Sequence, residues 1–214
     1  MSSIQNPPRV ALIDAGGANL GSVRYALQRL GVEPLVTAIA DEVASADRII
    51  LPGVGAAGSA MRLLRQRGLL GVLSKPPAPL LGICLGMQLL FEASEEGDVE
   101  CLGLLPGKVQ RMPASAGVRV PHMGWNRLQG RQSSPLLDGV ADGEQAYFVH
   151  SYAAPVTGDC IASSEHGQAF AAIVQRGQAA GMQFHPERSA ATGARLLRNF
   201  IVDGLASEVS RCAA

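Results

Sequence analysis

One cysteine of this sequence stands between two glycines in a setting that suits a nucleophile. Residues 80–91 read LLGICLGMQLLF, so Gly82 and Gly86 flank Cys84 in otherwise apolar surroundings. If a buried strand ends here and a helix begins near Leu85, the small neighbours permit a strained turn that exposes the cysteine at the edge of a sheet. The alternative is an inert core residue, because free cysteine is among the most buried residue types.

Such a turn would change the chemistry of the Cys84 thiol. The positive end of a helix macrodipole lowers a thiol pKa from about 8.5 toward the range in which thiolate is available at neutral pH. The backbone N–H of Leu85 would point toward an oxyanion formed on any substrate that Cys84 attacks. The pattern therefore predicts a nucleophile with an oxyanion donor beside it.

The segment 181–189, GMQFHPERS, offers a base for this nucleophile. His185 follows a strand-like run, and Glu187 projects to the same side of an extended backbone, where it could orient the imidazole. Pro186 fixes its own φ and restricts His185 to extended conformations. A surface salt bridge after a strand explains the same pattern, so both interpretations stay open at this point.

A third segment, LPGVGAAGSAM at residues 51–61, also follows a strand-like run. Gly53 and Gly55 release the steric limit on φ, so the peptide that links Gly53 to Val54 could turn its N–H toward a neighbouring reaction centre. An ordinary strand-to-helix turn or a phosphate cradle would look similar. The segment has neither the P-loop lysine nor a full G-x-G-x-x-G, which weakens the nucleotide interpretation.

Length and composition favour a single domain over residues 1–214. A chain of this length, 47% hydrophobic, can bury about 70% of its unfolded surface in one core. The 18 basic and 18 acidic residues balance, so the charge excess that nucleic acid or an anionic membrane requires is missing. The N-terminal MSSIQNPPRV has no apolar signal-peptide core and no apolar run reaches a membrane-spanning length, so we expect a cytoplasmic protein.

The cysteines and histidines show no metal-ligand spacing. Neither C-x-x-C nor H-x-x-x-H occurs, so we expect free thiols and no metal. Two of the histidines, His122 and His150, fit the role of half-buried hydrogen-bonding residues. The full set is Cys84, Cys101, Cys160, Cys212, His122, His150, His166 and His185.

The elements that must position these residues alternate between strand and helix through the first half. This alternation predicts a mostly parallel sheet covered on both faces, with functional loops at the carboxyl ends of its strands. Asn19 is the expected N-cap of the first helix, and Gly31 and Gly68 are expected to end two helices. We expect strands at 9–14, 33–37, 48–53 and 78–83 and helices at 18–31, at 58–68 and from about residue 85.

The second half is richer in short β runs separated by turn residues, which predicts antiparallel hairpins. The acidic segment 94–100, SEEGDVE, is on charge alone a solvated connection. No linker, internal repeat or low-complexity segment is present. We expect strands near 107–112, 145–152, 160–165, 170–177 and 179–184 and a last helix at 191–205.

Three motifs, in this order along the chain, resemble the triad-type (class I) glutamine amidotransferases: PGVG at 52–55, GICLGMQLLF at 82–91 and QFHPE at 183–187. Further segments resemble, within that family, the glutaminase subunits of imidazole glycerol phosphate synthases. These are LPGVGAAGSAM, PHMGWN at 121–126, YFVHSY at 147–152 and Met87 after CLG. The resemblance spans nearly the whole chain.

The resemblance implies a single-domain α/β fold and a cofactor-free reaction. Cys84 would attack the side-chain amide of glutamine and form a thioester. His185 would take the thiol proton and later protonate departing ammonia, while Glu187 would hold the useful tautomer. The implied oxyanion hole is Gly53, Val54 and Leu85, and the implied glutamine-binding residues are Gln88, Glu96, Ser151 and Tyr152. This role for Glu96 replaces the solvated connection expected from charge.

The resemblance also implies a partner, a (βα)8-barrel cyclase subunit that forms a heterodimer with this chain. The cyclase receives ammonia through an internal passage and makes imidazole glycerol phosphate and an aminoimidazole carboxamide ribotide, in histidine biosynthesis. Because glycines flank Val54, we hypothesise that its N–H is misdirected at rest and is turned by a ligand on the cyclase. The implied interface residues are Asn19, Met123, Trp125 and Arg188.

Some positions depart from the family pattern. Ala15 and Ala18 replace an aromatic residue and a glycine, Ala57 replaces a common phenylalanine, and Arg188 replaces a common lysine. The last departure matters most, since a planar guanidinium is not equivalent to an ammonium. None of these positions belongs to the triad.

Three other functions fit parts of the pattern. A free-standing γ-glutamyl hydrolase of the same fold would share Cys84, His185 and Glu187 but need no partner. A cysteine-based chaperone or deglycase of related fold usually has histidine directly after the cysteine, where this chain has Leu85. A binding module with a dead site would not need the intact triad.

Overall fold

An eight-stranded sheet runs through the middle of the protein, in the order β2-β1-β3-β4-β14-β13-β12-β9. The computed structural model describes residues 4–16, 19–114 and 117–205. The five strands β2, β1, β3, β4 and β14 pair with one another in parallel. From β14 the sheet continues through β13, β12 and β9 in antiparallel pairing. The strands are β1 (Val10–Ile13), β2 (Leu35–Thr37), β3 (Arg48–Gly53), β4 (Leu80–Cys84), β9 (Gln129–Gly130), β12 (Cys160–His166), β13 (Gln168–Arg176) and β14 (Ala179–Met182).

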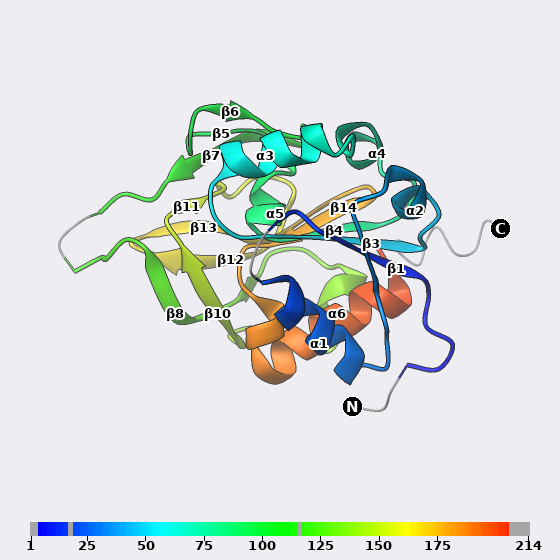
Figure 1. Cartoon of the computed structure of the whole chain (residues 1–214). Coiled ribbons are helices and arrows are strands. Elements are labelled where there is room, and N and C mark those ends of the chain that lie inside the picture. Colours follow the sequence, from blue (N-terminus) through cyan, green and yellow to red (C-terminus); the bar gives the residue numbers. More distant parts are fainter. Residues whose placement is uncertain (1–3, 17–18, 115–116, 206–214) are drawn as a thin grey trace.

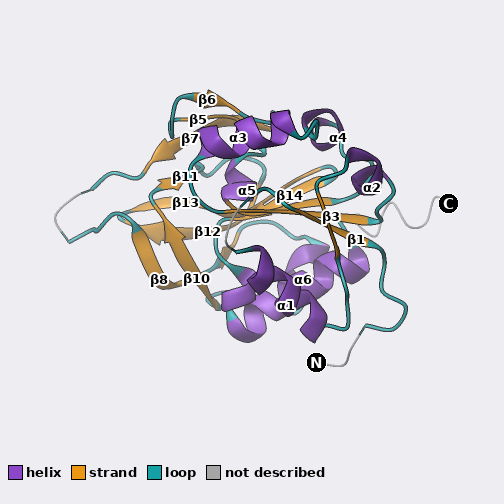
Figure 2. Cartoon of the chain, viewed as in Figure 1, coloured by secondary structure: helices purple, strands orange, loops and turns teal. Residues whose placement is uncertain are grey.

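Helices cover both faces of this sheet (Figures 1 and 2). α1 and α6 lie on one side, and α3 and α4 lie on the other (Figure 1). Two short 3-10 helices, η1 (Pro135–Leu137) and η2 (Pro186–Arg188), complete the set within the described residues. The helices are α1 (Leu20–Arg29), α2 (Ala40–Ala44), α3 (Ala57–Gln66), α4 (Leu70–Ser74), α5 (Leu85–Gln88) and α6 (Ala190–Asp203).

Two smaller sheets flank the central one. β8 (His122–Arg127) pairs with β10 (Gln145–His150) in an antiparallel ribbon. The other sheet has the order β11-β7-β5-β6 and contains β5 (Phe91–Ser94), β6 (Val99–Glu100), β7 (Leu105–Arg111) and β11 (Tyr152–Ala153).

Alternating side chains of the central strands build a core on each face. On β3, Ile50 joins the cluster that contains α1 and α6, whereas Ile49 and Leu51 join the cluster that contains α3 and α4. Successive strand residues point to opposite faces, so a parallel strand buried on both faces reads as a continuous apolar run. Both faces of the central sheet are therefore covered by apolar side chains.

The mostly parallel α/β architecture with an antiparallel second half is therefore confirmed, while several details differ. Residues 41–46, expected as a connection, contain α2. The helix after Cys84 begins at Leu85 as expected but ends at Gln88, after which the chain enters β5. The acidic segment 94–100 is not a free connection, because Ala93 and Ser94 pair with β6 in a hairpin.

The helix ends show where local signals hold and where they fail. Gly31 and Gly68 follow α1 and α3 with φ of 84° and 70°, the left-handed geometry of helix stops. Asn19 occupies the N-cap position of α1, but its side chain makes no capping hydrogen bond. The capping prediction is wrong because the side chain has a different partner, described below.

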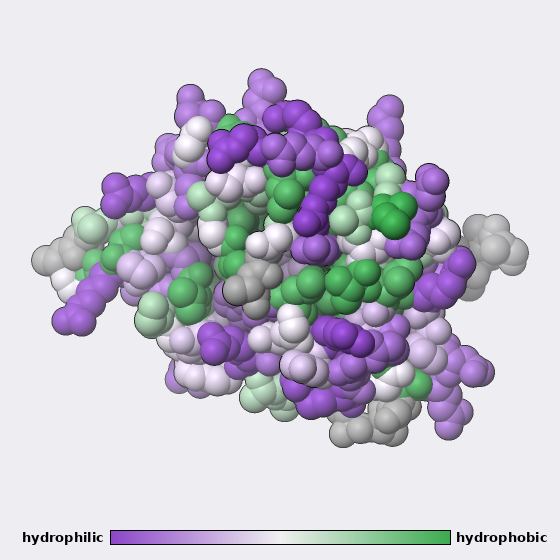
Figure 3. All heavy atoms as spheres, viewed as in Figure 1, coloured by the Kyte–Doolittle hydropathy of each residue, from purple (hydrophilic) through white to green (hydrophobic). Residues whose placement is uncertain are grey.

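The surface is mixed in character. On the face shown in Figure 3, hydrophobic residues form a band between two largely hydrophilic regions. Within the described part of the chain, no helix combines the length and apolarity needed to cross a bilayer. Ala18 and Cys212 lie outside the described residues. The most exposed large apolar side chains are Tyr25, Leu35, Val36, Ile39, Met123, Trp125 and Val202.

Candidate active site

The three sequence motifs meet at the carboxyl ends of three adjacent strands. β3 and β14 pair with β4 on either side, and Gly53 is the register partner of Cys84. Val54 follows β3, and His185 comes shortly after β14. The carboxyl edge of a parallel sheet is where ligands bind in open α/β folds, and sheet order brings together segments more than a hundred residues apart.

Cys84 sits on a strained turn that only small neighbours allow. Its φ is 54° and its ψ is −111°, a conformation that costs a non-glycine residue about 1–3 kcal/mol. A Cβ on Gly86 would lie 1.8 Å from the Leu51 carbonyl oxygen, and a Cβ on Gly82 would lie 2.5 Å from the Gly86 oxygen. The two glycines therefore act through close backbone approach, as the strand-to-helix turn requires.

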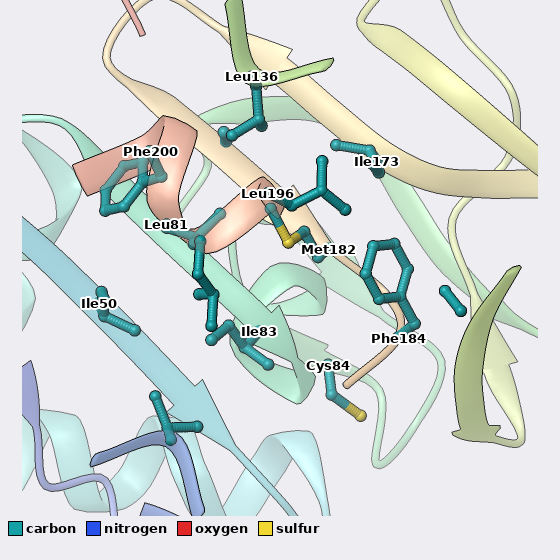
Figure 4. Packing of buried hydrophobic residues seen from close by; sticks show 14 of the residues in the cluster. Ile50, Leu81, Ile83, Cys84, Leu136, Ile173, Met182, Phe184, Leu196 and Phe200 are labelled. Atoms are coloured by element: carbon teal, nitrogen blue, oxygen red, sulfur yellow. The ribbon is translucent and has the colours of Figure 1, made fainter. Parts of the chain in front are cut away.

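The sulfur of Cys84 faces a cavity rather than the interior of the core. The residue is 8% exposed and belongs to the larger core cluster. Figure 4 shows its sulfur directed away from Ile83 and the other labelled core side chains. Cys84 lines a cavity of about 360 Å³, and its Sγ lies 3.9 Å from the Val149 carbonyl oxygen. Small-molecule sites in proteins have this concave form.

His185 and Glu187 form a buried pair at the same cavity. Nδ1 of His185 lies 2.8 Å from Oε1 of Glu187, and the Glu187 side chain is 0% exposed. Burial alone would lower the pKa of His185, but hydrogen bonds to Cys84 and Glu187, and the charges of both, raise it to about 10. The surroundings therefore favour the protonated ring, and the burial of both side chains excludes the surface salt bridge left open above.

The turn that carries His185 is fixed from several sides. The backbone N–H of His185 donates to the Tyr147 carbonyl oxygen at 2.9 Å. The Ser189 hydroxyl donates to the His185 carbonyl oxygen at 2.7 Å and accepts from the Tyr147 N–H at 2.9 Å. α6 approaches so closely that a Cβ on Gly193 would lie 1.9 Å from the Pro186 oxygen. The imidazole therefore has a fixed approach to the sulfur.

Asn19 contacts the triad, a role that sequence reasoning missed. Its Nδ2 donates to Oε1 of Glu187 at 2.8 Å and lies 3.3 Å from Nδ1 of His185. The other carboxylate oxygen, Oε2, has no partner among the described residues. Half of the hydrogen bonding to this buried carboxylate thus comes from Asn19, which had been assigned to helix capping and the interface.

The residues expected to form the oxyanion hole lie around the sulfur. Val54 and Leu85 line the cavity with Cys84. Of the two glycines beside Val54, Gly55 has a φ of 95°, whereas Gly53 is needed for space, since its Cβ would lie 2.9 Å from the Gly86 nitrogen. The two glycines are therefore required for different reasons, Gly55 for its backbone conformation and Gly53 for its close approach to α5.

The expected glutamine-binding residues Gln88, Glu96, Ser151 and Tyr152 all line the cavity. Gln88 is buried, and its Nε2 donates to the Tyr152 carbonyl oxygen at 2.8 Å and to Oε1 of Gln183 at 3.0 Å. The Glu96 carboxylate accepts from the Ala57 N–H at 2.8 Å. Gln183, absent from the sequence-based assignment, has its Nε2 at 4.0 Å from the Cys84 sulfur. Its place two residues before His185 was the available signal.

The expected interface residues on β8 and η2 form an exposed cluster. Met123 and Trp125 are 64% and 52% exposed. The rings of Trp125 and Tyr147 meet edge to face at 5.9 Å, and the Arg188 guanidinium lies 5.6 Å from the Tyr147 ring centre. These side chains lie together on the surface, whereas Asn19 points inward to Glu187.

Comparison with known proteins gives a consistent result. The family model described as glutamine amidotransferase class-I matches residues 11–203. The imidazole glycerol phosphate synthase subunit HisH of Xylella fastidiosa is 63% identical over 192 residues, which cover 90% of this chain and 96% of that protein. The HisH subunit of Xanthomonas oryzae is 64% identical over the same shares.

Solved structures with this fold are more distant in sequence. One described as a glutamine amidotransferase superposes with a TM-score of 0.70 at 22% identity, covering 89% of this chain and 96% of the other. A chain from the structure of PurLQS of Thermotoga maritima has a TM-score of 0.68 at 19% identity, with coverage of 90% and 97%. At these identities the likeness concerns the fold alone.

Proposed function

The chain belongs to the class I glutamine amidotransferases and, within them, to the HisH subunits of imidazole glycerol phosphate synthase, and we propose from this premise how its own residues work. It is a glutaminase subunit that hydrolyses glutamine and feeds the ammonia to a cyclase subunit in histidine biosynthesis. The roles of individual residues follow from the geometry of the cavity.

The proposed nucleophile is the Cys84 thiolate. It attacks the side-chain amide carbon of glutamine and forms a tetrahedral oxyanion, in which the sulfur no longer carries a negative charge. His185 then loses one of the charges that raise its pKa and gives its proton to the amide nitrogen. The tetrahedral species collapses, expels ammonia and leaves a thioester on Cys84. Neutral His185 next activates the water that hydrolyses the thioester, while Glu187 holds the ring.

The N–H of Leu85 is the proposed fixed oxyanion donor. Leu85 is the first residue of α5, so its N–H has no carbonyl acceptor within the helix. The N–H of Val54 is the proposed adjustable donor. Loss of one such donor typically lowers kcat about 10²–10³-fold. We propose that a ligand on the cyclase favours the productive orientation of the Val54 peptide. Glutaminase turnover indifferent to the cyclase and its nucleotide ligand would rule this switch out.

Glutamine itself is proposed to bind along the wall formed by Gln88, Glu96, Ser151 and Tyr152. The Glu96 carboxylate supplies the negative charge that the substrate's α-ammonium needs. The backbone carbonyl of Tyr152 orients Gln88 through the hydrogen bond described above. Ser151 offers its hydroxyl and backbone groups to the substrate. No cofactor takes part in this scheme.

The cluster of Met123, Trp125, Tyr147 and Arg188 is the proposed surface for the (βα)8-barrel cyclase. Ammonia released into water would be protonated and lose its nucleophilicity, so a closed heterodimer is the arrangement that makes the reaction productive. Arg188 has an exposed guanidinium stacked on an aromatic ring, an interaction worth about 0.5–1 kcal/mol. We expect Arg188→Ala to weaken complex formation several-fold, measured by titration calorimetry.

The observation that carries the proposal is the cavity at which Cys84 meets the buried His185–Glu187 pair. A glutaminase assay on wild type and Cys84→Ala, each with and without the cyclase, tests it. We expect wild-type activity to rise with the cyclase and the variant to be inactive in both states. High activity of wild type alone, unchanged by the cyclase, would instead favour a free-standing γ-glutamyl hydrolase.

A further inference from the structure

A row of hydrogen-bonded groups runs from β8 to the wall of the glutamine cavity. Nδ2 of Asn126 lies 3.2 Å from Nε2 of His122, and Nδ1 of His122 lies 3.0 Å from Nε2 of His150. Nδ1 of His150 lies 2.9 Å from the Tyr152 carbonyl oxygen. Both histidines are buried, and the reaction scheme above uses neither ring.

The partners of Asn126 fix where every proton in this row sits. Its Oδ1 accepts from the Arg127 N–H at 2.8 Å, and its Nδ2 donates to the Glu165 carbonyl oxygen at 2.8 Å. The amide can therefore only donate to His122, whose Nε2 must accept. His122 then carries its proton on Nδ1 and donates to Nε2 of His150, and His150 in turn donates from Nδ1 to the carbonyl.

This arrangement requires both rings to be neutral. A second proton on either histidine would set two N–H groups against each other or against the amide of Asn126. Burial, together with the charge that His166 would carry, lowers the pKa of His122 to about 4. Burial and the neighbouring His122 lower the pKa of His150 to about 3. At neutral pH, each of the two rings is therefore neutral, donates a hydrogen bond from Nδ1 and accepts one at Nε2.

The row of hydrogen bonds ends at the carbonyl oxygen of Tyr152, a residue that also lines the cavity. The Tyr152 oxygen accepts a second hydrogen bond from Gln88, whose Nε2 also reaches Gln183 beside the Cys84 sulfur. The carbonyl is therefore the junction between the histidine row and the part of α5 that follows the nucleophile. If this oxygen shifts, the hydrogen bond that orients Gln88 shifts with it.

We propose that His122 and His150 are positioning residues which, held by Asn126, fix the Tyr152 carbonyl and through it the glutamine-binding wall. The inference rests on the proposed function, because glutamine is taken as the substrate. It concerns binding rather than bond breaking, since the row does not touch His185 or Glu187. Loss of the row should therefore raise KM for glutamine and leave the reactivity of the Cys84 sulfur unchanged.

Kinetics of the complex with the cyclase test this prediction. His122→Phe keeps an aromatic ring beside Phe148 but removes the donor to His150, and we expect KM for glutamine to rise about tenfold, the usual effect of one lost hydrogen bond. The rate of Cys84 alkylation by iodoacetamide should stay within about twofold of wild type. His122→Asn, whose amide can donate from nearly the same place as Nδ1, should restore most of the affinity.

His166→Phe is the matched control. His166 stacks on His122 with ring centres 4.2 Å apart but lies outside the row, so its replacement should leave KM unchanged. Equal KM values for His122→Phe and wild type, or equal increases in His122→Phe and His166→Phe, would overturn the proposal.

A second measurement covers the case in which His122→Phe does not fold. Nitrogen-15 NMR of the wild-type histidine rings at neutral pH should show His122 and His150 in the neutral form protonated on Nδ1. Protonation of either ring on Nε2, or a positively charged ring, would overturn the proposal. Because this signal does not depend on turnover, an enzyme that shows these tautomers but fails to hydrolyse glutamine would refute the proposed function and not the role of the histidine row.

Discussion

His185 and His150 both line the cavity beside Cys84, yet their surroundings hold them in opposite protonation states. His185 lies between a carboxylate and a sulfur, and these partners raise its pKa to about 10 in spite of its burial. His150 is buried against another histidine, and its pKa falls to about 3. Burial disfavours the charge at both rings, and only a neighbouring anion reverses that effect.

The contrast separates two uses of the same side chain. A histidine held by anions keeps a proton that it can release when one anion disappears, which suits proton transfer to a leaving group. A histidine held by neutral partners keeps one tautomer and serves as a fixed donor and acceptor. The cavity wall therefore contains a histidine that can transfer a proton, His185, and a histidine that holds a fixed position, His150. Removing the Glu187 carboxylate should make His185 behave like His150.

The most direct way to break the comparison is Glu187→Gln. The amide cannot stabilise the imidazolium and favours the wrong tautomer, so we expect kcat to fall on the order of 10³–10⁴-fold in the cyclase complex. The measurement is steady-state glutaminase kinetics, and Glu100→Gln on the exposed strand β6 is the control. A variant that keeps more than a tenth of wild-type kcat would contradict the assigned role of the carboxylate.

Gly86→Ala tests the geometry that puts the sulfur beside His185. The added methyl would lie 1.8 Å from the Leu51 oxygen, so α5 must move away from β3 at a cost of about 1–3 kcal/mol or more. We expect a lower free energy of unfolding in urea and slow alkylation of Cys84. Gly71→Ala in α4, where a Cβ meets no atom within 4 Å, should be neutral or stabilising. Normal Cys84 reactivity in Gly86→Ala would exclude this account of the turn.

Asn19→Ala sharpens the view of His185 as a residue held by an anion. The variant removes the hydrogen bond to Oε1 of Glu187 and leaves a buried carboxylate with one partner fewer, so we expect kcat to fall about tenfold. KM for glutamine should hardly change, because Asn19 does not line the cavity wall that binds it. Gln28→Ala, near the C-terminal end of α1, is the control. A rise in KM with unchanged kcat would point instead to a role in binding.

The pH dependence of stability separates the two histidine environments. In the unfolded chain each histidine has a pKa near the ordinary value of 6.5. Protonated His185 stabilises the folded state fully below pH 6.5, and this contribution is lost as pH rises toward 10. Neutral His122 and His150 stabilise it above pH 6.5, and their contribution is lost as pH falls toward 4 and 3.

Urea denaturation across this range measures both arms. His122→Phe should flatten the acid arm, and His185→Gln should flatten the alkaline arm, each relative to wild type. An acid arm that is unchanged in His122→Phe would show that its ring is not kept neutral by folding.

Much of the site could be predicted from the sequence because each motif is local. The glycines around Cys84 and the spacing of His185 and Glu187 determine turn geometry within a few residues, and strand ends in an α/β pattern indicate one edge. The contact between Asn19 and Glu187 spans 168 residues and left no local signal. The N-cap preference of asparagine pointed to a nearer partner that its side chain does not use.

Two errors in the fold have similar origins. The apolar run after Cys84 reads equally well as helix or strand, so the end of α5 at Gln88 and the start of β5 could not be separated by periodicity. β8 was not expected because Pro121 precedes it and a glycine and a tryptophan lie within it, a pattern that resembles a turn. Its pairing with β10 supplies what the local sequence lacks.

The close approach at Gly82, Gly86 and Gly193 has a consequence at the level of the gene. Every single-base change in a glycine codon that does not preserve glycine or end the chain introduces a residue with a Cβ. At these positions that atom would meet a backbone oxygen at 2.5, 1.8 and 1.9 Å. The codons for these glycines therefore have no conservative missense neighbour, although their side chains take no part in the chemistry.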